Sequence, residues 1–285
     1  SKQMYGGTCI NVGCLPSKNL ILSGQRGLDF TTAVNKRGEM TRQLRNKNYH
    51  MVADEPLATI WDGSARFIDN YVLAVVMSDG TTKKVRGERI FINTGAVPNW
   101  PSIPGLEFGQ RIFTSKEAME LEKQPKRLAI IGGGYIGLEF AGMFNSFGTH
   151  VTIFDQHTRL LEREDPDIAT EVVADLTDAG IEIKPETQLT QVKDNGEKVT
   201  LYYQQGDQSN TAEFDAVLVA VGRRPNVSSL GLENTDIALT NRGAIQVDDH
   251  LRTTVQNIWA LGDVNGGPMF TYVSLDDFRI IVDQL

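Results

Sequence analysis

The sequence predicts an α/β protein with a parallel sheet and a dinucleotide-binding loop. Strands and helices alternate from Arg127 onward, a G-x-G-x-x-G loop joins the first of these strands to a helix, and an acidic residue ends the next strand. The chain has 285 residues, 40% of them hydrophobic, which is enough for two domains. We therefore expect two domains, one of them a dinucleotide-binding domain.

Different elements are expected before this alternating part. A loop with both cysteines is followed by a helix-like stretch up to residue 26. The segments "GSARFID", "YVLAVVMSDGTTKKV" and "RIFINTG", within 60–94, predict strands, with a turn at Ser78-Asp79-Gly80. The proline-rich stretch 97–105, "VPNWPSIPG", predicts a linker that crosses between domains.

The alternating pattern begins with the apolar strand "RLAIIGGG" and continues with the helix "YIGLEFAGMFNSFG" and the strand "HVTIFD". In the next helix Asp165 suits the N-cap, Pro166 the first position and Gly180 the end. A third strand, "IEIKPE", completes a βαβαβ unit, and such units form parallel sheets.

The last elements are a hairpin, two strands and a helix. The hairpin is expected around Asp194-Asn195-Gly196, and "FDAVLVAVG" is typical of a buried strand. The segment "NIWALGDV" predicts one more strand, which leads into the helix "FTYVSLDDFRIIVDQL". No stop signal follows this helix.

Both cysteines lie in "GGTCINVGCLPSK", residues 6–18. Five residues of regular helix separate Cα atoms by about 7.5 Å, whereas a disulfide allows about 6.8 Å. Cys9 and Cys14 can therefore pair only across a distorted turn, which Gly13 permits. Because Pro16 suits a first helical turn, Cys14 would begin a helix whose dipole favours the thiolate. The pattern favours a disulfide that opens and closes during turnover.

Two other interpretations of the cysteines stay open. Inert buried thiols would need neither the glycines nor this spacing. Half of a bridged zinc site would require further ligands, and no histidine lies nearby in the sequence.

The glycine loop has the context that a dinucleotide fingerprint requires. Its first glycine would make the tight turn, the second would let the pyrophosphate approach the helix N-terminus, and the third would let helix pack on strand. A glycine turn that binds nothing is the alternative. The expected nucleotide contacts are Gly132, Gly133, Gly134, Tyr135, Ile136 and Gly137.

Asp155 ends the second strand, about twenty residues after the glycine loop. At this position a carboxylate accepts a hydrogen bond from the ribose 2′-hydroxyl and repels a 2′-phosphate. NADH is therefore favoured over NADPH, although the nearby His157 and Arg159 weaken this preference.

A dinucleotide site and a redox disulfide in one chain require an intermediary. A hydride carries two electrons and reacts slowly with a disulfide directly. A flavin is the natural relay.

Five motifs follow one another along the chain: "GGTCINVGCLPSK", "INTGA", "GGGYIGLE", "VGRRPN" and "ALGDV". In this order and approximate spacing they resemble the class I pyridine nucleotide–disulfide oxidoreductases, the family of glutathione reductase, lipoamide dehydrogenase and mercuric reductase. The resemblance covers essentially all 285 residues. It implies a glutathione-reductase-like α/β fold with two Rossmann-like domains, one for FAD and one for NAD(P)H.

The resemblance also implies roles for individual residues. Cys14 would be the thiol next to the flavin, and Cys9 the interchange thiol that attacks the substrate. Lys18 would lie near flavin N5 and pair with Glu139, and Tyr135 would gate the nicotinamide pocket. Further contacts are implied with FAD for Thr8, Gly63, Asp263 (ribityl chain) and Thr271 (start of a helix that faces the ring), and with NAD(P)H for Val192 and Gly222.

Packing alone is the alternative explanation for four of these residues, namely Tyr135, Gly63, Val192 and Thr271.

Three further segments, "LRNKNYH", "RIFINTGA" and "FTYVSLDDFRII", resemble a narrower bacterial subgroup linked to reactive-chlorine resistance. Its members reduce hypothiocyanous acid, and copper(II) is a second candidate substrate. Other branches generally differ where "FTYVSLDDFR" stands, which argues against lipoamide or glutathione as substrate. No paired-cysteine extension suggests mercury handling, and no resident metal is expected.

The chain departs from the family pattern at both ends. Family members carry an FAD-binding G-x-G-x-x-G before the cysteine loop, but only five residues precede Gly6. They end in an interface domain with a His-Glu pair, a role that none of the four histidines here fits. We therefore expect a fragment truncated at both ends. Its expected parts are the first part of the FAD domain (1–114), the NAD(P)H domain (115–228) and the return segment of the FAD domain (229–285).

Composition narrows the partners. The formal charge of −8, without a basic run, argues against nucleic acid and anionic membranes. The longest mostly apolar segment, residues 127–144, contains Glu139 and five glycines and is not a membrane span. Nothing suggests export, so a cytoplasmic protein is expected.

The sequence thus predicts an FAD-dependent oxidoreductase. Electrons would pass from NAD(P)H via FAD to the Cys9–Cys14 disulfide and on to a small oxidant, with hypothiocyanous acid and copper(II) as candidates. The full-length protein is expected to be a homodimer. The alternatives are dihydrolipoamide dehydrogenase or another disulfide reductase of the family, and an inert nucleotide-binding module.

Overall fold

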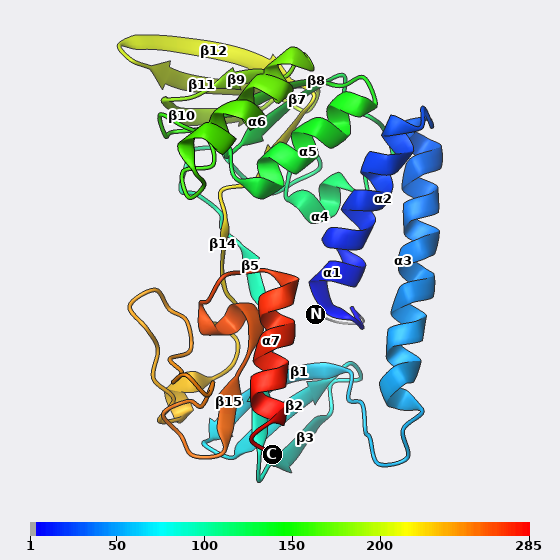
Figure 1. Cartoon of the computed structure of the whole chain (residues 1–285), viewed down its shortest axis with the longest axis vertical. Coiled ribbons are helices and arrows are strands. Elements are labelled where there is room, and N and C mark those ends of the chain that lie inside the picture. Colours follow the sequence, from blue (N-terminus) through cyan, green and yellow to red (C-terminus); the bar gives the residue numbers. More distant parts are fainter. Residues whose placement is uncertain (1–3) are drawn as a thin grey trace. The chain divides into compact units, whose positions relative to one another are not determined.

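The computed structural model describes residues 4–285, whose helices and strands Figure 1 shows. The described residues divide into two compact units. Unit 1 comprises residues 52–97 and 223–285, and unit 2 comprises residues 4–51 and 98–222. One crossing between the units, at residues 97–98, falls at the start of the proline-rich stretch.

Unit 2 contains nearly all the helices of the described chain. They are α1 (Gly7–Asn11), α2 (Cys14–Gln25), α3 (Phe30–Ala53, whose last two residues belong to unit 1), α4 (Ser115–Ala118), α5 (Tyr135–Ser146) and α6 (Pro166–Asp178). Its strands are β6 (Ile112–Phe113), β7 (Arg127–Ile131), β8 (His150–Phe154), β9 (Glu182–Lys184), β10 (Thr187–Asp194), β11 (Val199–Gln205), β12 (Gln208–Phe214) and β13 (Ala216–Val219).

The sheet that carries the glycine loop is parallel throughout. Its five strands have the order β6-β13-β7-β8-β9, and each neighbouring pair is parallel. Strands β7, β8 and β9 alternate with α5 and α6, so the predicted βαβαβ unit is confirmed. From β7 the chain moves outward to β8 and β9, then returns to place β13 on the other side of β7, as in a Rossmann-like fold.

The two faces of this sheet bury different partners, because side chains alternate along a strand. Leu128 and Ile130 of β7 pack in a core with Phe140 and Phe144 of α5, to which α2 and α3 also contribute. Ala129 and the residues that share its face pack against the antiparallel sheet β10-β11-β12. Burial on both faces explains why the strand sequences are almost continuously apolar.

Two long elements have no counterpart in the sequence-based expectation. Strand β12 extends the predicted hairpin to three strands, but most of its residues are exposed, so its polar sequence gives little strand signal. Helix α3 buries only Phe30, Ala33, Arg37 and Thr41. Since two of these are polar, no apolar stripe revealed the helix.

Unit 1 contains β1 (Gly63–Asp69), β2 (Val72–Met77) and β3 (Thr82–Arg86), which form an antiparallel sheet. The strands expected there are thus confirmed. The other elements are β4 (Ile90–Ile92), β5 (Ala96–Pro98), β14 (Arg223–Pro225), the 3₁₀ turns η1 (Leu232–Asn234) and η2 (Gly262–Asn265), β15 (Ile258–Ala260), which pairs with β4, and α7 (Thr271–Val282).

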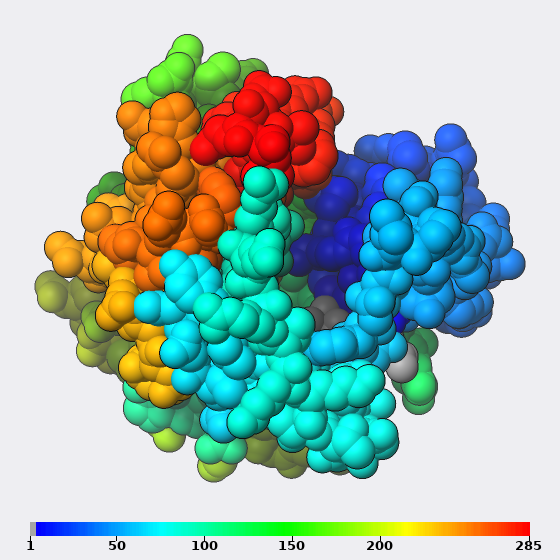
Figure 2. Space-filling model, turned by 90° about the horizontal axis from the view of Figure 1, so that it is seen from below, coloured from blue at the N-terminus to red at the C-terminus, as the bar shows by residue number. Residues whose placement is uncertain are grey.

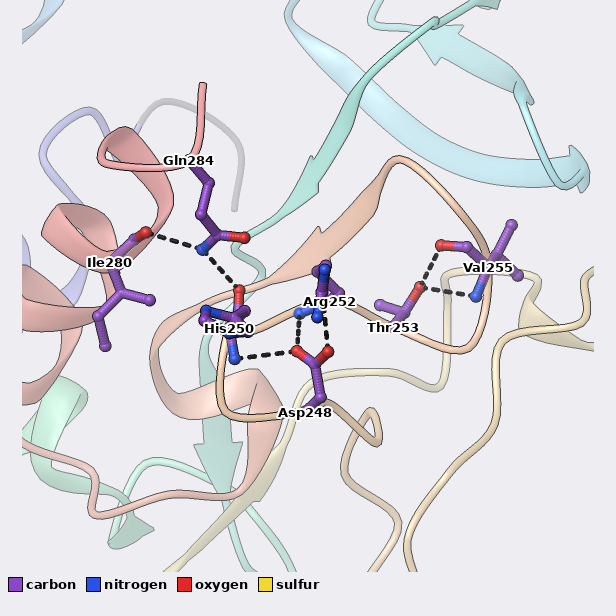
Figure 3. Close-up of polar contacts among 7 residues, drawn as sticks. All are labelled: Asp248, His250, Arg252, Thr253, Val255, Ile280 and Gln284. Carbon is purple, nitrogen blue, oxygen red and sulfur yellow. Dashed lines mark hydrogen bonds and ion pairs between the residues drawn. The ribbon is translucent and has the colours of Figure 1, made fainter.

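The end of α7 is held by the loop that precedes β15 (Figure 3). Gln284 Nε2 donates to the carbonyl of His250 at 3.0 Å, and Asp248 accepts bonds from the backbone of His250 and from Arg252. The outer side of α7 lies on the surface of unit 1 (Figure 2, red), where Tyr272 and Phe278 are exposed.

Within residues 4–285 we find no helix with the length and apolar character needed to cross a membrane.

Candidate active site

The two cysteines lie on either side of a break between two helices. Helix α1 ends at Asn11 and α2 begins at Cys14. Between them Gly13 adopts φ −137° and ψ −119°, and a Cβ there would lie 3.1 Å from the carbonyl oxygen of Thr8. The distorted turn expected from the sequence is present. It leaves Cys14 exposed at the start of α2 and Cys9 half-buried in α1.

Glu139 of α5 connects the cysteine-bearing helix α2 to the nucleotide-loop helix. One of its oxygens, Oε1, accepts a hydrogen bond from buried Ser17 at 2.5 Å. The same oxygen forms an ion pair with Lys18 Nζ at 2.7 Å. Lys18 is mostly exposed, so the ion pair by itself contributes at most about 1 kcal/mol. The geometry therefore favours Ser17 as the stronger anchor between α2 and α5.

The glycine loop has the form of an open cradle. Gly132 adopts φ +108°, and a Cβ on it would lie 2.6 Å from the carbonyl oxygen of Ala220. A Cβ on Gly137 would lie 2.0 Å from the oxygen of Gly132, so α5 can approach β7 only without a side chain there. Around Gly134, by contrast, a Cβ would meet no described atom within 4 Å. This open position suits the approach of a phosphate group.

The N-terminus of α5 provides backbone N–H groups at this open position. Gly134 is its N-cap, and no side chain of the described residues caps the helix there. Uncapped amides with the positive end of the helix dipole attract anions. Tyr135 is exposed and Ile136 half-buried in this first turn.

The carboxylate of Asp155 lies between the glycine loop and the loop after β8. Asp155 is buried, with 8% of its surface exposed. Its carboxylate accepts hydrogen bonds from the Gly133 amide at 2.5 Å and from the His157 amide at 2.8 Å. The His157 ring lies 2.7 Å away at Nδ1. Arg159 instead donates to the backbone carbonyls of Glu162 and Glu164. Both neighbouring side chains thus have protein partners.

The other predicted nucleotide contacts differ in their surroundings. Tyr135 donates its hydroxyl to Glu164, which raises the pKa of the phenol. Gly222, at φ +92°, follows β13, next to the end of β7. Val192 is buried, with its side chain in the core and its amide donating to Pro104 at 2.8 Å.

Thr8 is exposed in α1 of unit 2, and the other three predicted FAD contacts belong to unit 1. Gly63 begins β1, where a Cβ would lie 2.6 Å from the carbonyl oxygen of Val76, and Thr271 begins α7. Asp263 in η2 is half-buried, and this burial raises the pKa of its carboxyl, although attraction to Arg223 opposes the shift. Burial likewise lowers the pKa of Arg223, against the attraction of Asp263.

Three residues that support the predicted site or the segments that carry it were missed in the sequence. Ser17 supports Glu139, and Arg45 of α3 donates to Asn11 in the cysteine segment at 2.6 Å. Buried Asp277 of α7 accepts hydrogen bonds from the Gly262 amide and from the side chain of Asn265. It therefore holds η2, the turn that carries Asp263. Only the polar character of residues inside quoted motifs could have drawn attention to them.

The chain belongs to the pyridine nucleotide-disulphide oxidoreductase family, whose model matches residues 3–277. Among curated proteins it is 44% identical, over its whole length, to the probable pyridine nucleotide-disulfide oxidoreductase RclA of Escherichia coli K12. It is also 36% identical, over 98% of its length, to a mercuric reductase of Streptomyces lividans. The expected family and fold class are thereby confirmed.

A solved structure gives the same relationship. The Cu(II) complex of the HOCl-induced flavoprotein disulfide reductase RclA from E. coli superimposes on the whole chain with a TM-score of 0.95 and 43% identity. The chain covers 63% of that protein, 64% of the curated RclA and 62% of the mercuric reductase. It thus spans just under two thirds of the relatives it matches.

Proposed function

We propose that the protein is a flavin-dependent oxidoreductase that passes electrons from NAD(P)H to the Cys9–Cys14 pair and on to a small oxidant. One observation carries the proposal: the helix that begins at Cys14 is tied through Glu139 to the helix that begins at the nucleotide loop. Similarity to a flavoprotein disulfide reductase supports it.

The residues fit both cofactors. Gly134 and the uncapped start of α5 would receive the pyrophosphate of NAD(P)H, and Asp155 its adenosine ribose. Asp263 offers a half-buried carboxylate beside Arg223, a suitable acceptor for ribityl hydroxyls. Bound FAD would supply the two-electron chemistry between a hydride donor and a disulfide. Its other expected contacts are Thr8, Lys18, Gly63 and Thr271.

The cysteines would carry out the reduction of the oxidant. With hypothiocyanous acid, the Cys9 thiolate attacks the electrophilic sulfur, and the departing hydroxide takes a proton to become water. The Cys14 thiolate then attacks the Cys9 sulfur and expels thiocyanate. Two thiols are oxidised to one disulfide as the oxidant gains two electrons. Copper(II), the second candidate, would require two ions for each disulfide, with one electron going to each.

The remaining parts of the proposal concern the whole protein. We place it in the cytoplasm as a homodimer that acts on a small-molecule oxidant. Residues 1–114 and 229–285 would contribute to its FAD domain, and residues 115–228 would form its NAD(P)H domain. The proposal favours NADH as donor because Asp155 directly follows β8, where dinucleotide folds carry the acid that binds the ribose.

The proposal is tested by an absorption spectrum of the purified chain, supplied with FAD, before and after anaerobic addition of NADH. The expected result is a set of flavin bands and, on reduction, a new long-wavelength absorbance that Cys14→Ser removes. In the full-length protein, Cys14→Ser is expected to lower NADH-dependent reduction of hypothiocyanous acid by at least about a thousandfold.

Unchanged turnover in Cys14→Ser would contradict a redox role and favour a nucleotide-binding module with inert cysteines. A substrate panel with hypothiocyanous acid, copper(II), lipoamide and glutathione disulfide decides the acceptor. Preference for lipoamide would assign the activity named for another relative, a dihydrolipoyl dehydrogenase of Corynebacterium glutamicum that is 33% identical to the chain.

A further inference from the structure

One face of α3 contacts the segment that leads into the first cysteine. Arg45, Asn48 and Tyr49 lie on the same side of the helix, because residues three and four apart are neighbours there. The Tyr49 ring meets the ring of Tyr5 edge to face, with the centroids 4.7 Å apart. Gly6 lies so close to Asn48 that a Cβ on the glycine would be 2.9 Å from Asn48 Cγ. Helix α3 therefore supports the start of α1 directly.

Asn11 connects these two elements at the other end of α1. Its Nδ2 donates to the carbonyls of Tyr5 at 2.9 Å and Gly7 at 2.8 Å, and its Oδ1 accepts from Arg45 Nε at 2.6 Å. With 1% exposure, Asn11 cannot replace these bonds with water. A cation on the acceptor end of the amide also strengthens the two bonds that the other end donates.

Helix α1 depends on such support. It has five residues, far fewer than a helix needs to be stable in isolation. Its entry passes through Gly6 at φ +90° and Gly7 at φ +69°, and no side chain of the described residues caps it. The conformation of the segment around Cys9 is therefore maintained by contacts with residues outside α1. The most buried α1 residue in these contacts is Asn11, which accepts the hydrogen bond from Arg45.

We propose that Arg45 is a positioning residue for the Cys9–Cys14 pair and acts through Asn11. Removal of its guanidinium would leave the Asn11 oxygen buried without this donor and would loosen α1. Cys9 would then spend less time within reach of Cys14, so the disulfide would form less readily. The inference rests on the proposed function in one respect, since it assumes that the two cysteines form a redox pair.

The test measures the equilibrium of the purified chain with glutathione buffers. The two thiols react with glutathione disulfide to give the Cys9–Cys14 disulfide and two molecules of glutathione, and mass spectrometry after rapid alkylation quantifies each form. Arg45→Met is expected to lower the equilibrium constant about tenfold, the effect of losing one charged hydrogen bond. Arg45→Lys keeps the charge but lacks the Nε donor, and should lower it by about threefold.

Arg42→Met is the matched control, because Arg42 is an exposed arginine on the same helix. It should give the wild-type constant. Hydrogen exchange provides a second readout: the amides of residues 7–11 should exchange faster in Arg45→Met and at the wild-type rate in Arg42→Met. Should Arg45→Met fail to fold, Arg45→Lys decides the test.

The possible results separate the two proposals. A wild-type chain that forms no Cys9–Cys14 disulfide overturns the proposed redox function and the inference with it. A wild-type disulfide, together with constants for both Arg45 variants equal to that of Arg42→Met, overturns the inference alone. A decrease confined to the Arg45 variants supports it.

Discussion

At the scale of single residues, Asp155 links two parts of the nucleotide loop. Its oxygens accept hydrogen bonds from the backbone amides of Gly133 and His157. In dinucleotide-binding folds the acid that binds the ribose stands at this same place, directly after the second strand. The carboxylate can accept further bonds, since it has about four lone-pair sites. The His157 ring contacts Asp155, and Arg159 donates to backbone carbonyls, so both side chains are already engaged within the protein. These contacts support the proposed preference for NADH.

Replacement of this acid is expected to change the choice of nucleotide. Asp155→Ser should weaken NADH binding about tenfold, the loss of one charged hydrogen bond, and should narrow or reverse the preference over NADPH. Fluorescence titration with each nucleotide measures the dissociation constants. Asp178→Ser, at an exposed position of α6, is the control. Tighter binding of NADPH than of NADH by the wild type would contradict the assignment.

At the scale of elements, the approach of α5 to β7 defines the nucleotide loop. The helix contributes Phe140 and Phe144 to the core that covers one face of the sheet. This packing requires the first turn of α5 to lie close to the end of β7. Gly137 makes the contact possible, since a Cβ there would overlap the carbonyl oxygen of Gly132. The same helix carries Glu139 to Ser17 and Lys18 of α2. Displacement of α5 would therefore disturb both the loop and the cysteine helix.

Two alanine substitutions in α5 test this dependence. Gly137→Ala should lower the free energy of unfolding by about 3 kcal/mol through steric overlap. Gly142→Ala should raise it by up to about 1 kcal/mol, because a Cβ there meets no described atom within 4 Å and alanine favours the helix. Urea denaturation measures both. Equal stabilities of the two variants would show that the contact is unimportant.

At the scale of the whole molecule, acidic groups set the pH dependence of stability. Asp248 shows the direction of this dependence. Slight burial raises the pKa of its carboxyl, but hydrogen bonds from Arg252 and His250 outweigh this effect and hold the pKa below the ordinary value of 3.8. A depressed carboxyl pKa contributes stability that is present above the unfolded-state value. That stability is lost as the pH falls through the folded-state value. The loop shown in Figure 3 should therefore weaken below about pH 4.

Asp248→Asn should lower the free energy of unfolding at pH 7 by at most about 1 kcal/mol, since the ion pair is exposed. The difference from wild type should shrink as the pH falls below about 4, where the wild-type carboxylate becomes protonated. Thermal melts from pH 7 to pH 3 measure it, with Asp249→Asn as the control at the exposed neighbouring position. A difference that is constant with pH would contradict the argument.

The sequence by itself determined the local features of this protein. The alternation of strands and helices in 127–219, the tight turn at Gly132 and the distorted turn before Cys14 all follow from nearby residues. Apolar period, glycine freedom and capping act over only a few positions. The motifs that predicted the family are local in the same sense, and the family match confirms them.

Apart from the Lys18–Glu139 pair, which the family resemblance implied, only the tertiary structure decided which distant side chains meet. Ser17 and Glu139 are 122 positions apart, and Arg45 and Asn11 are 34 apart. Asp277 is buried whereas its neighbour Asp276 is exposed, although their sequence surroundings are the same. Such contacts depend on how whole elements pack. A polar residue carries no local sign of the partner it will find once α2, α3 and α5 have come together, and this is why the supports of the site were absent from the sequence-based prediction.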